Sequence, residues 1–185
     1  MKWFNEPEKW NFNGGKLTIR VTPRSDYWRK THYGFTADNG PFYFTEKEGN
    51  FEMSVKITGD YRTTYDQMGL MLRLNEKHWI KTGIEYVNGV HNFSTVITHD
   101  FSSWNIIPLP ENPASLWIKA VRKSDAVEIF YSLDGIKWQM ANIAYFAPQG
   151  QVMAGMMSAS PQGTGFDAVF ENFHISETVE NDKEI

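Results

Sequence analysis

The sequence predicts an all-β fold, a two-sheet antiparallel jelly-roll sandwich. Three observations support this prediction. Short segments that alternate apolar and polar residues recur along nearly the whole chain, which is the period of a strand that buries one face. Turn residues separate these segments, and no convincing amphipathic helix of ten or more residues interrupts them. Because about eleven strands in one open sheet would curl or split, we expect two packed sheets.

The expected strands, in chain order, cover residues 16–22, 42–45, 50–59, 67–74, 78–87, 90–98, 115–123, 127–133, 137–145, 152–160 and 166–176. Turns are marked by residues that favour reversals, namely Gly14-Gly15, Asn39-Gly40-Pro41, Asn88-Gly89, Ser124-Asp125, Asp134-Gly135 and Ser160-Pro161. We expect one domain over residues 1–176. The acidic, aperiodic segment 177–185 is expected to be a flexible tail.

Two hairpins between residues 67 and 98 define the most informative surface. If residues 75–77 form a three-residue loop, Leu74 pairs with His78 and Gln67 with Glu85. The Asn88-Gly89 turn then pairs Glu85 with Asn92. Both turns place apolar side chains on one face and a polar and aromatic row, expected to be solvated, on the other. The members of this row are Gln67, Arg73, Trp79, Lys81, Glu85 and Asn92.

Composition and charge exclude several classes of function. The 185 residues include no cysteine, so disulfides, thiolate metal sites and a cysteine nucleophile are excluded. The net charge of −4, from 18 basic and 22 acidic residues, gives no basic footprint, and we expect no nucleic-acid partner. No apolar run is long enough to span a membrane and the N-terminus lacks a signal-peptide pattern, so we expect no membrane partner and a cytoplasmic location.

Catalytic and cofactor chemistry finds little support in the sequence. Glu85 is the best-placed acid, but retaining glycoside hydrolysis needs a second carboxylate about 5 Å away. The strand neighbours of Glu85 are the amides Gln67 and Asn92, and Asp66 could reach it only from the edge of the sheet. The histidines lack a third ligand at fixed spacing, and no phosphate-binding glycine loop occurs, so we expect neither a metal nor a cofactor.

Several strings, spread in order over residues 4–176, resemble one known family. They are Asp26–Phe35 (DYWRKTHYGF), Asp60–Arg62 (DYR), Tyr65–Met71 (YDQMGLM), Trp79–Glu85 (WIKTGIE) and Tyr131–Gly135 (YSLDG). On these motifs the chain resembles the domain-of-unknown-function family named for the fungal "regulation of enolase" protein, in the concanavalin A-like lectin and glucanase superfamily. The resemblance implies a concanavalin A-like jelly roll with a concave sheet. One departure is Ser103, where we expect the family to favour aspartate before the tryptophan.

The resemblance also implies a set of candidate site residues. They are Trp28, Thr31, His32, Asp66, Gln67, Lys81, Glu85 and Trp104. Together with the polar row, these positions predict a non-catalytic binding domain, lectin-like, that recognises a saccharide or a polyhydroxylated metabolite on the concave face. Tryptophan faces stack on sugar rings while amides and carboxylates bind hydroxyl groups. Trp28, Trp79 and Trp104 would supply the faces, and the facing pair Gly69 and Gly83 indicates a gap kept open for a ligand or a neighbouring aromatic.

Two alternatives stay open. One is an intracellular regulatory module, linked to carbohydrate metabolism, that binds a protein partner, as the family name suggests. The other is a weak glycoside hydrolase or lyase that uses Glu85 and Asp66.

Overall fold

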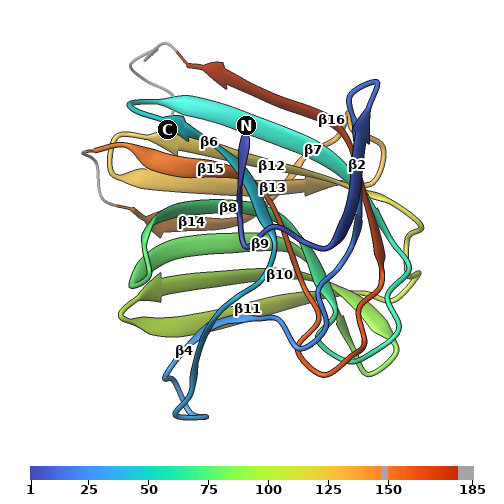
Figure 1. Cartoon of the computed structure of the whole chain (residues 1–185). Coiled ribbons are helices and arrows are strands. Elements are labelled where there is room, and N and C mark those ends of the chain that lie inside the picture. Colours follow the sequence, from blue (N-terminus) through green and yellow to red (C-terminus); the bar gives the residue numbers. More distant parts are fainter. Residues whose placement is uncertain (147–149, 179–185) are drawn as a thin grey trace.

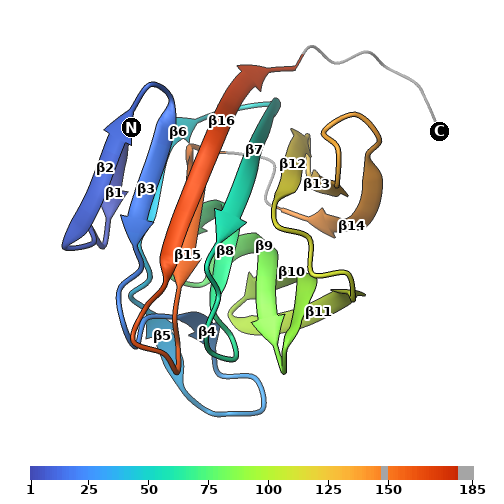
Figure 2. The same cartoon turned by 90° about the vertical axis from the view of Figure 1, so that its right-hand side faces the viewer.

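The computed structural model describes residues 1–146 and 150–178, which form two packed antiparallel sheets (Figures 1 and 2). Sheet A has the order β1 (Lys2–Phe4), β6 (Phe42–Lys47), β15 (Val152–Ala159), β8 (Gln67–Asn75), β9 (His78–Val87), β10 (Val90–His99) and β11 (Phe101–Leu109). Sheet B has the order β14 (Gln139–Tyr145), β13 (Ala126–Ser132), β12 (Leu116–Lys123), β7 (Phe51–Gly59), β16 (Asp167–Glu177), β3 (Lys16–Arg20) and β2 (Lys9–Asn13). A separate hairpin joins β4 (Tyr27–Arg29) and β5 (Thr36–Asp38). The predicted two-sheet antiparallel sandwich is confirmed.

All eleven predicted strands are present, and their ends differ from the prediction by no more than two residues. Five strands were not predicted, namely β1, β2, β4, β5 and β11. Three of these are only three residues long, and β2 is exposed along its whole length. Strand β11 contains Pro108, which a sheet tolerates because β11 is an edge strand. No helix in the described part of the chain is long and apolar enough to cross a membrane.

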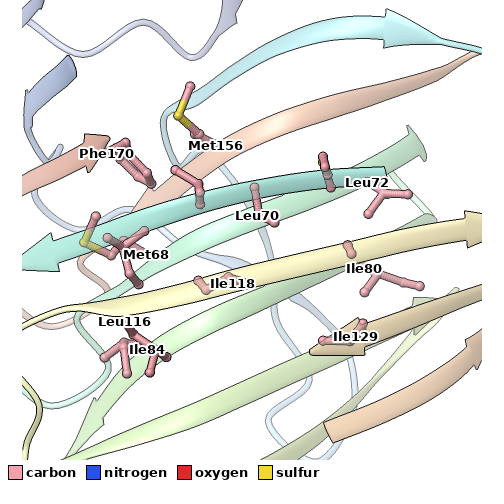
Figure 3. Packing of buried hydrophobic residues seen from close by; sticks show 14 of the residues in the cluster. Met68, Leu70, Leu72, Ile80, Ile84, Leu116, Ile118, Ile129, Met156 and Phe170 are labelled. Carbon is pink, nitrogen blue, oxygen red and sulfur yellow. The ribbon is translucent and has the colours of Figure 1, made fainter. Parts of the chain in front are cut away.

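The core lies between the two sheets, where the apolar face of the β8 and β9 hairpin meets sheet B (Figure 3). From sheet A it contains Met68, Leu70, Leu72, Ile80 and Ile84. From sheet B it contains Leu116, Ile118, Ile129 and Phe170. Each of these side chains is at most 3 % exposed, as strand alternation predicts for the inner face of a sandwich.

The predicted register of the two central hairpins is largely confirmed. Gln67 pairs with Glu85, and Glu85 pairs with Asn92, so the three side chains stand abreast on neighbouring strands. This register places them on the face of sheet A that points away from sheet B.

The β8–β9 turn differs from the prediction. Asn75, rather than Leu74, pairs with His78, and the ladder is irregular at Leu74. The turn is therefore the two residues Glu76 and Lys77. The side chain of Asn75 stabilises it, because Asn75 Oδ1 accepts hydrogen bonds from the backbone N–H groups of Lys77 (2.8 Å) and His78 (3.1 Å).

The two facing glycines do not keep a gap open for a ligand. A Cβ atom at Gly69 would lie 1.9 Å from the carbonyl oxygen of Thr82, and one at Gly83 would lie 2.1 Å from that of Met68. The neighbouring strand's backbone fills the space, so the prediction of a ligand gap was wrong. Glycine is needed here because β8 and β9 approach too closely for any side chain.

The β4–β5 hairpin lies on the outer face of sheet A, beside β11 (Figure 1). Its Tyr27 and Trp28 join a second apolar cluster, whose members from sheet A include Phe42, Phe44, Met71, Trp79, Val96, Met157 and Ala159. Polar contacts fix the hairpin as well. The backbone N–H of Arg29 donates to Ser102 Oγ (2.9 Å), and its guanidinium pairs with Asp100 (2.7 Å). Sheet A is therefore covered on both faces over part of its width.

The C-terminal segment begins as part of the sandwich. Strand β16 continues to Glu177, and the N–H of Thr178 donates to the carbonyl of Asn50 (3.2 Å). The rest of the predicted tail, residues 179–185, lies outside the described residues.

Candidate ligand pocket on the outer face of sheet A

The polar row predicted from the sequence exists, but it is not solvated. All six members, Gln67, Arg73, Trp79, Lys81, Glu85 and Asn92, are at most 6 % exposed. The prediction of an open, wet row was wrong because the β4–β5 hairpin and the loops beside it fold over this face. At one end of the row, the closed end, the hairpin packs directly on the side chains. At the other end, the open end, a pocket remains between the hairpin and the sheet.

At the closed end, Arg73 and Trp79 contact the β4–β5 hairpin and hold it on sheet A. The two terminal nitrogens of Arg73 each donate to one oxygen of Asp38 at 2.7 Å, which ties β5 to β8. Trp79 is 1 % exposed, packs edge-on against Tyr27 at 6.0 Å, and donates its indole N–H to the carbonyl of Glu76 (3.3 Å). A buried indole cannot stack on a sugar, so Trp79 is not a binding platform.

At the open end lies a pocket of about 370 Å³, a size typical of small-molecule sites. Sheet A contributes the side chains Gln67, Lys81, Glu85, Val96 and Trp104. The hairpin and the loops contribute Asp26, Trp28, Tyr33, Phe35, Tyr65, Pro161 and Gln162. The pocket thus combines strand residues that form a rigid base with loop residues that form its walls.

Five of the ten predicted site residues line this pocket, namely Trp28, Gln67, Lys81, Glu85 and Trp104. Arg73 and Trp79 lie at the closed end. His32 lines a neighbouring surface hollow with Thr31 and Ser103. Asn92 donates its amide to the backbone carbonyls of Val90 (2.9 Å) and Glu85 (3.4 Å) and supports the hairpin.

Asp66, the remaining predicted residue, is fully buried and holds two loops together. Its Oδ2 accepts hydrogen bonds from the backbone N–H groups of Arg62 and Thr63, both at 2.9 Å. Its Oδ1 accepts a hydrogen bond from Ser160 Oγ at 2.6 Å. Both carboxylate oxygens are therefore engaged outside the pocket, and Asp66 is not available to act beside Glu85.

Glu85 is the buried acid of the pocket base. Its Oε2 accepts hydrogen bonds from Trp104 Nε1 and Ser94 Oγ, both at 2.7 Å, whereas its Oε1 accepts none from the described residues. Burial raises the pKa of the Glu85 carboxyl above its usual range. The positive charge of Lys81 and the two hydrogen bonds offset part of this rise.

Lys81 lies on the same face of β9 as Glu85, and its ammonium group contacts three protein oxygens. It donates to the carbonyl of Tyr27 (2.7 Å) and to Gln67 Oε1 (2.5 Å), and it lies 3.5 Å from Asp26 Oδ1. The ammonium group thus makes two hydrogen bonds and one ion pair. These contacts fix the segment before β4 over the sheet.

Asp26 is the most important site residue that sequence reasoning missed. Its Oδ1 accepts a hydrogen bond from the N–H of Tyr27 (2.7 Å) and contacts Lys81, and its Oδ2 accepts none from the described residues. The strand register offered Glu85 only amide neighbours, but Asp26 brings a second carboxylate into the pocket from a loop far away in the sequence. The available signal was its position at the start of the longest family-like string.

Aromatic side chains form most of the wall. Trp28 packs edge-on against Tyr33 (5.7 Å), and Tyr65 packs edge-on against Trp104 (6.3 Å). Phe35 completes the set, and Tyr33, Phe35 and Tyr65 were not predicted as site residues. In residues 1–146 and 150–178 no three His, Cys, Asp or Glu side chains gather as a metal ion would require.

Fold and pocket together define a concanavalin A-like β-sandwich domain with a recessed site on one sheet face. The particular family follows from comparison with known sequences. The family described as "Protein of unknown function (DUF1349)" matches residues 3–178, and the chain belongs to this family. The predicted family resemblance is confirmed.

Individual relatives agree with this assignment. "Regulation of enolase protein 1" of Saccharomyces cerevisiae is 30 % identical over 174 residues, which cover 94 % of this chain and 88 % of that protein. A crystal structure of a functionally unknown protein from Saccharomyces cerevisiae superposes with a TM-score of 0.93 at 30 % identity, covering 97 % of both chains. The GH43 BlXynB protein from Bacillus licheniformis shares the fold, with a TM-score of 0.72 at 18 % identity over 94 % of this chain and 36 % of that one.

Proposed function

We propose that this protein is a non-catalytic binding domain for a saccharide or a similar polyhydroxylated metabolite, held in the pocket between sheet A and the β4–β5 hairpin. One observation carries the proposal. Aromatic side chains line one pocket together with two carboxylates, Asp26 and Glu85, and each carboxylate keeps one oxygen without a hydrogen bond to the described residues. Sugars need this combination, because their C–H faces stack on aromatic rings while their hydroxyl groups donate to carboxylate oxygens.

The pocket is preorganised for such a ligand. Glu85 is held by Trp104 and Ser94, and Asp26 is held by Lys81 and the N–H of Tyr27. Binding would therefore order few side chains, which lowers its entropic cost.

Isothermal titration with a panel of pentoses, hexoses and short oligosaccharides tests the proposal. Trp104→Ala is expected to weaken binding of any sugar that binds by about tenfold or more, which is roughly 1.4 kcal/mol. The matched control is Trp10→Ala, because Trp10 lies on β2 of sheet B, outside the pocket, and should leave binding unchanged. Absence of binding by every sugar, or equal effects of the two variants, would contradict the proposal.

A second candidate is glycoside hydrolysis by Glu85 with Asp26, in place of the predicted pair with Asp66. Two observations favour it, namely two carboxylates in one pocket and a raised pKa of Glu85, which suits a general acid. Turnover of labelled oligosaccharides that is lost in Glu85→Gln and kept in Trp10→Ala would establish it. Binding without turnover would instead support the non-catalytic domain.

A regulatory role is the third candidate, and it draws on the name of the yeast relative. Sugar-dependent capture of a protein partner from extract, abolished by Trp104→Ala, would support it. Capture that needs no sugar and is unchanged by Trp104→Ala would show that the partner does not bind through the pocket.

A further inference from the structure

At the buried base of the pocket, the hydrogen-bonding groups left free for a ligand are acceptors rather than donors. Every strong donor there is already engaged by the protein. The ammonium of Lys81 faces three acceptors, and the amide of Gln67 donates to the carbonyl of Tyr65 (3.1 Å). The indole N–H groups of Trp28 and Trp104 are also engaged. Tyr33, Tyr65 and Gln162 offer further polar groups, but none of them is among the fully buried residues.

The groups that the base leaves free for a ligand carry negative charge. Oδ2 of Asp26 and Oε1 of Glu85 accept no hydrogen bond from the described residues. Among the described residues, the charged groups that line the pocket are these two carboxylates and Lys81, so their formal sum is −1 when both acids are ionised. A ligand that reaches the base must therefore bring hydrogen-bond donors, and a positive charge would be favoured over a neutral group.

The walls favour a positive charge as well. Five aromatic side chains line the same pocket as the two carboxylates, namely Trp28, Tyr33, Phe35, Tyr65 and Trp104. The faces of aromatic rings attract cations, and proteins recognise ammonium ligands with groups of aromatic side chains. An anionic sugar acid, by contrast, would meet two carboxylates and no free buried cation among the described residues.

We propose that the preferred ligand carries a protonated amine beside its hydroxyl groups, as an amino sugar does. The ammonium group donates to Glu85 Oε1 and Asp26 Oδ2, and the sugar ring stacks on the aromatic wall. This inference rests on the proposed function and names the ligand class of the same pocket.

Titration with three matched sugars tests the inference, namely D-glucosamine, N-acetyl-D-glucosamine and D-glucose, with the galactose series in parallel. The amine is expected to bind at least tenfold more tightly than the parent sugar, and acetylation is expected to abolish this preference because it removes the charge. Equal binding of the amine and the parent sugar would overturn the inference and leave the saccharide proposal standing. Choline serves as an additional probe, because it carries a positive charge but no sugar ring. Its binding without binding of any sugar would overturn the saccharide proposal and the amino-sugar class together, as would binding of no probe.

A substitution separates charge from shape. Glu85→Gln keeps the shape of the side chain, but its one amide oxygen accepts the hydrogen bonds from Trp104 and Ser94 and its NH2 group replaces Oε1. The charge and the free acceptor are both lost, so the affinity for glucosamine is expected to fall to that for glucose. The control, Glu48→Gln, makes the same change of net charge at an exposed residue outside the pocket, and it should leave the preference intact. Chemical denaturation of both variants verifies that they fold. A preference for the amine that survives in folded Glu85→Gln would overturn the inference.

The pH dependence gives an independent readout. Glu85 is faced by Lys81 on its own strand, Ser94 on β10, Trp104 on β11 and Asp26 from the loop before β4. Because burial raises its pKa, the affinity for glucosamine should increase with pH as Glu85 loses its proton. A fall in affinity over the same range below the pKa of the sugar amine would contradict this assignment.

Discussion

Replacing Asp38 with asparagine should loosen the β4–β5 hairpin from sheet A. In the native protein both oxygens of Asp38 accept hydrogen bonds from Arg73, at 2.7 Å each, and Arg73 is only 4 % exposed. The guanidinium also lies over the ring of Phe4, 4.8 Å from its centroid. Asp38→Asn removes the negative charge and leaves a buried positive charge without its counter-ion.

The expected loss of stability is about 3 kcal/mol. Breaking a buried ion pair by removing one partner costs roughly 3–5 kcal/mol. The lower end applies because the side chain of Asp38 is 28 % exposed, so water can partly replace it. For a domain of this size the loss corresponds to a fall in Tm of roughly 6–12 °C.

Urea unfolding monitored by tryptophan fluorescence measures this change. The matched control is Glu46→Gln, which breaks the exposed pair between Lys2 and Glu46. This control should cost less than about 1 kcal/mol, because exposed ion pairs contribute little. Asp38→Asn should also weaken any ligand binding in the pocket, since Trp28 is positioned by the same hairpin.

Two results would contradict this role of the Arg73–Asp38 ion pair. One is an Asp38→Asn variant as stable as the Glu46→Gln control. The other is a double variant, Arg73→Met with Asp38→Leu, that is less stable than Asp38→Asn alone, because replacing both charges by apolar groups should restore stability if the unpaired cation is the cause.

Three further predictions concern the sheet beneath the pocket. Gly69→Ala should lower the free energy of unfolding in urea by about 3 kcal/mol, because its Cβ would meet the Thr82 carbonyl. The control Gly14→Ala, which lies in open space, should lower it by only about 1 kcal/mol, and equal losses in the two variants would contradict the prediction. Lys81→Met should raise the pKa of Glu85 further in a carbon-13 NMR titration, since the charge of Lys81 lowers it; an unchanged pKa would show that the two do not interact. Because the native state holds the Glu85 proton more tightly than the unfolded chain, the stability of the wild type relative to Glu85→Gln should fall as pH rises above about 4.3, and a rise would contradict the sign.

The sequence predicts the fold correctly where strand alternation and turn residues determine the structure of neighbouring segments. Asn88-Gly89 forms the predicted hairpin, and the pairing of Gln67, Glu85 and Asn92 follows from it. The turn at Glu76 was misassigned because hydrogen bonds to the side chain of Asn75 close it. Such a side-chain contact cannot be predicted from the alternation of apolar and polar residues.

The site was accessible only in part. Five predicted residues line the pocket. Strand alternation placed Gln67, Lys81 and Glu85 on one face, whereas Trp28 and Trp104 were implied only by the family resemblance. Burial of the row depends on a hairpin that comes from a distant part of the sequence, and no local pattern determines where such a hairpin packs. For the same reason Trp79 was taken for a platform and Asp26 was missed.

The β4–β5 hairpin also bears on how the pocket could change. Tyr33 and Phe35, near its tip, are 55 % and 45 % exposed, so they form the wall of the pocket without supporting the core. Substitutions there would alter ligand choice at little cost in stability, whereas substitutions at Lys81 or Glu85 would disturb buried charges. The domain therefore combines a fixed recognition base with an exchangeable rim, the arrangement by which antibody loops diversify on a constant framework.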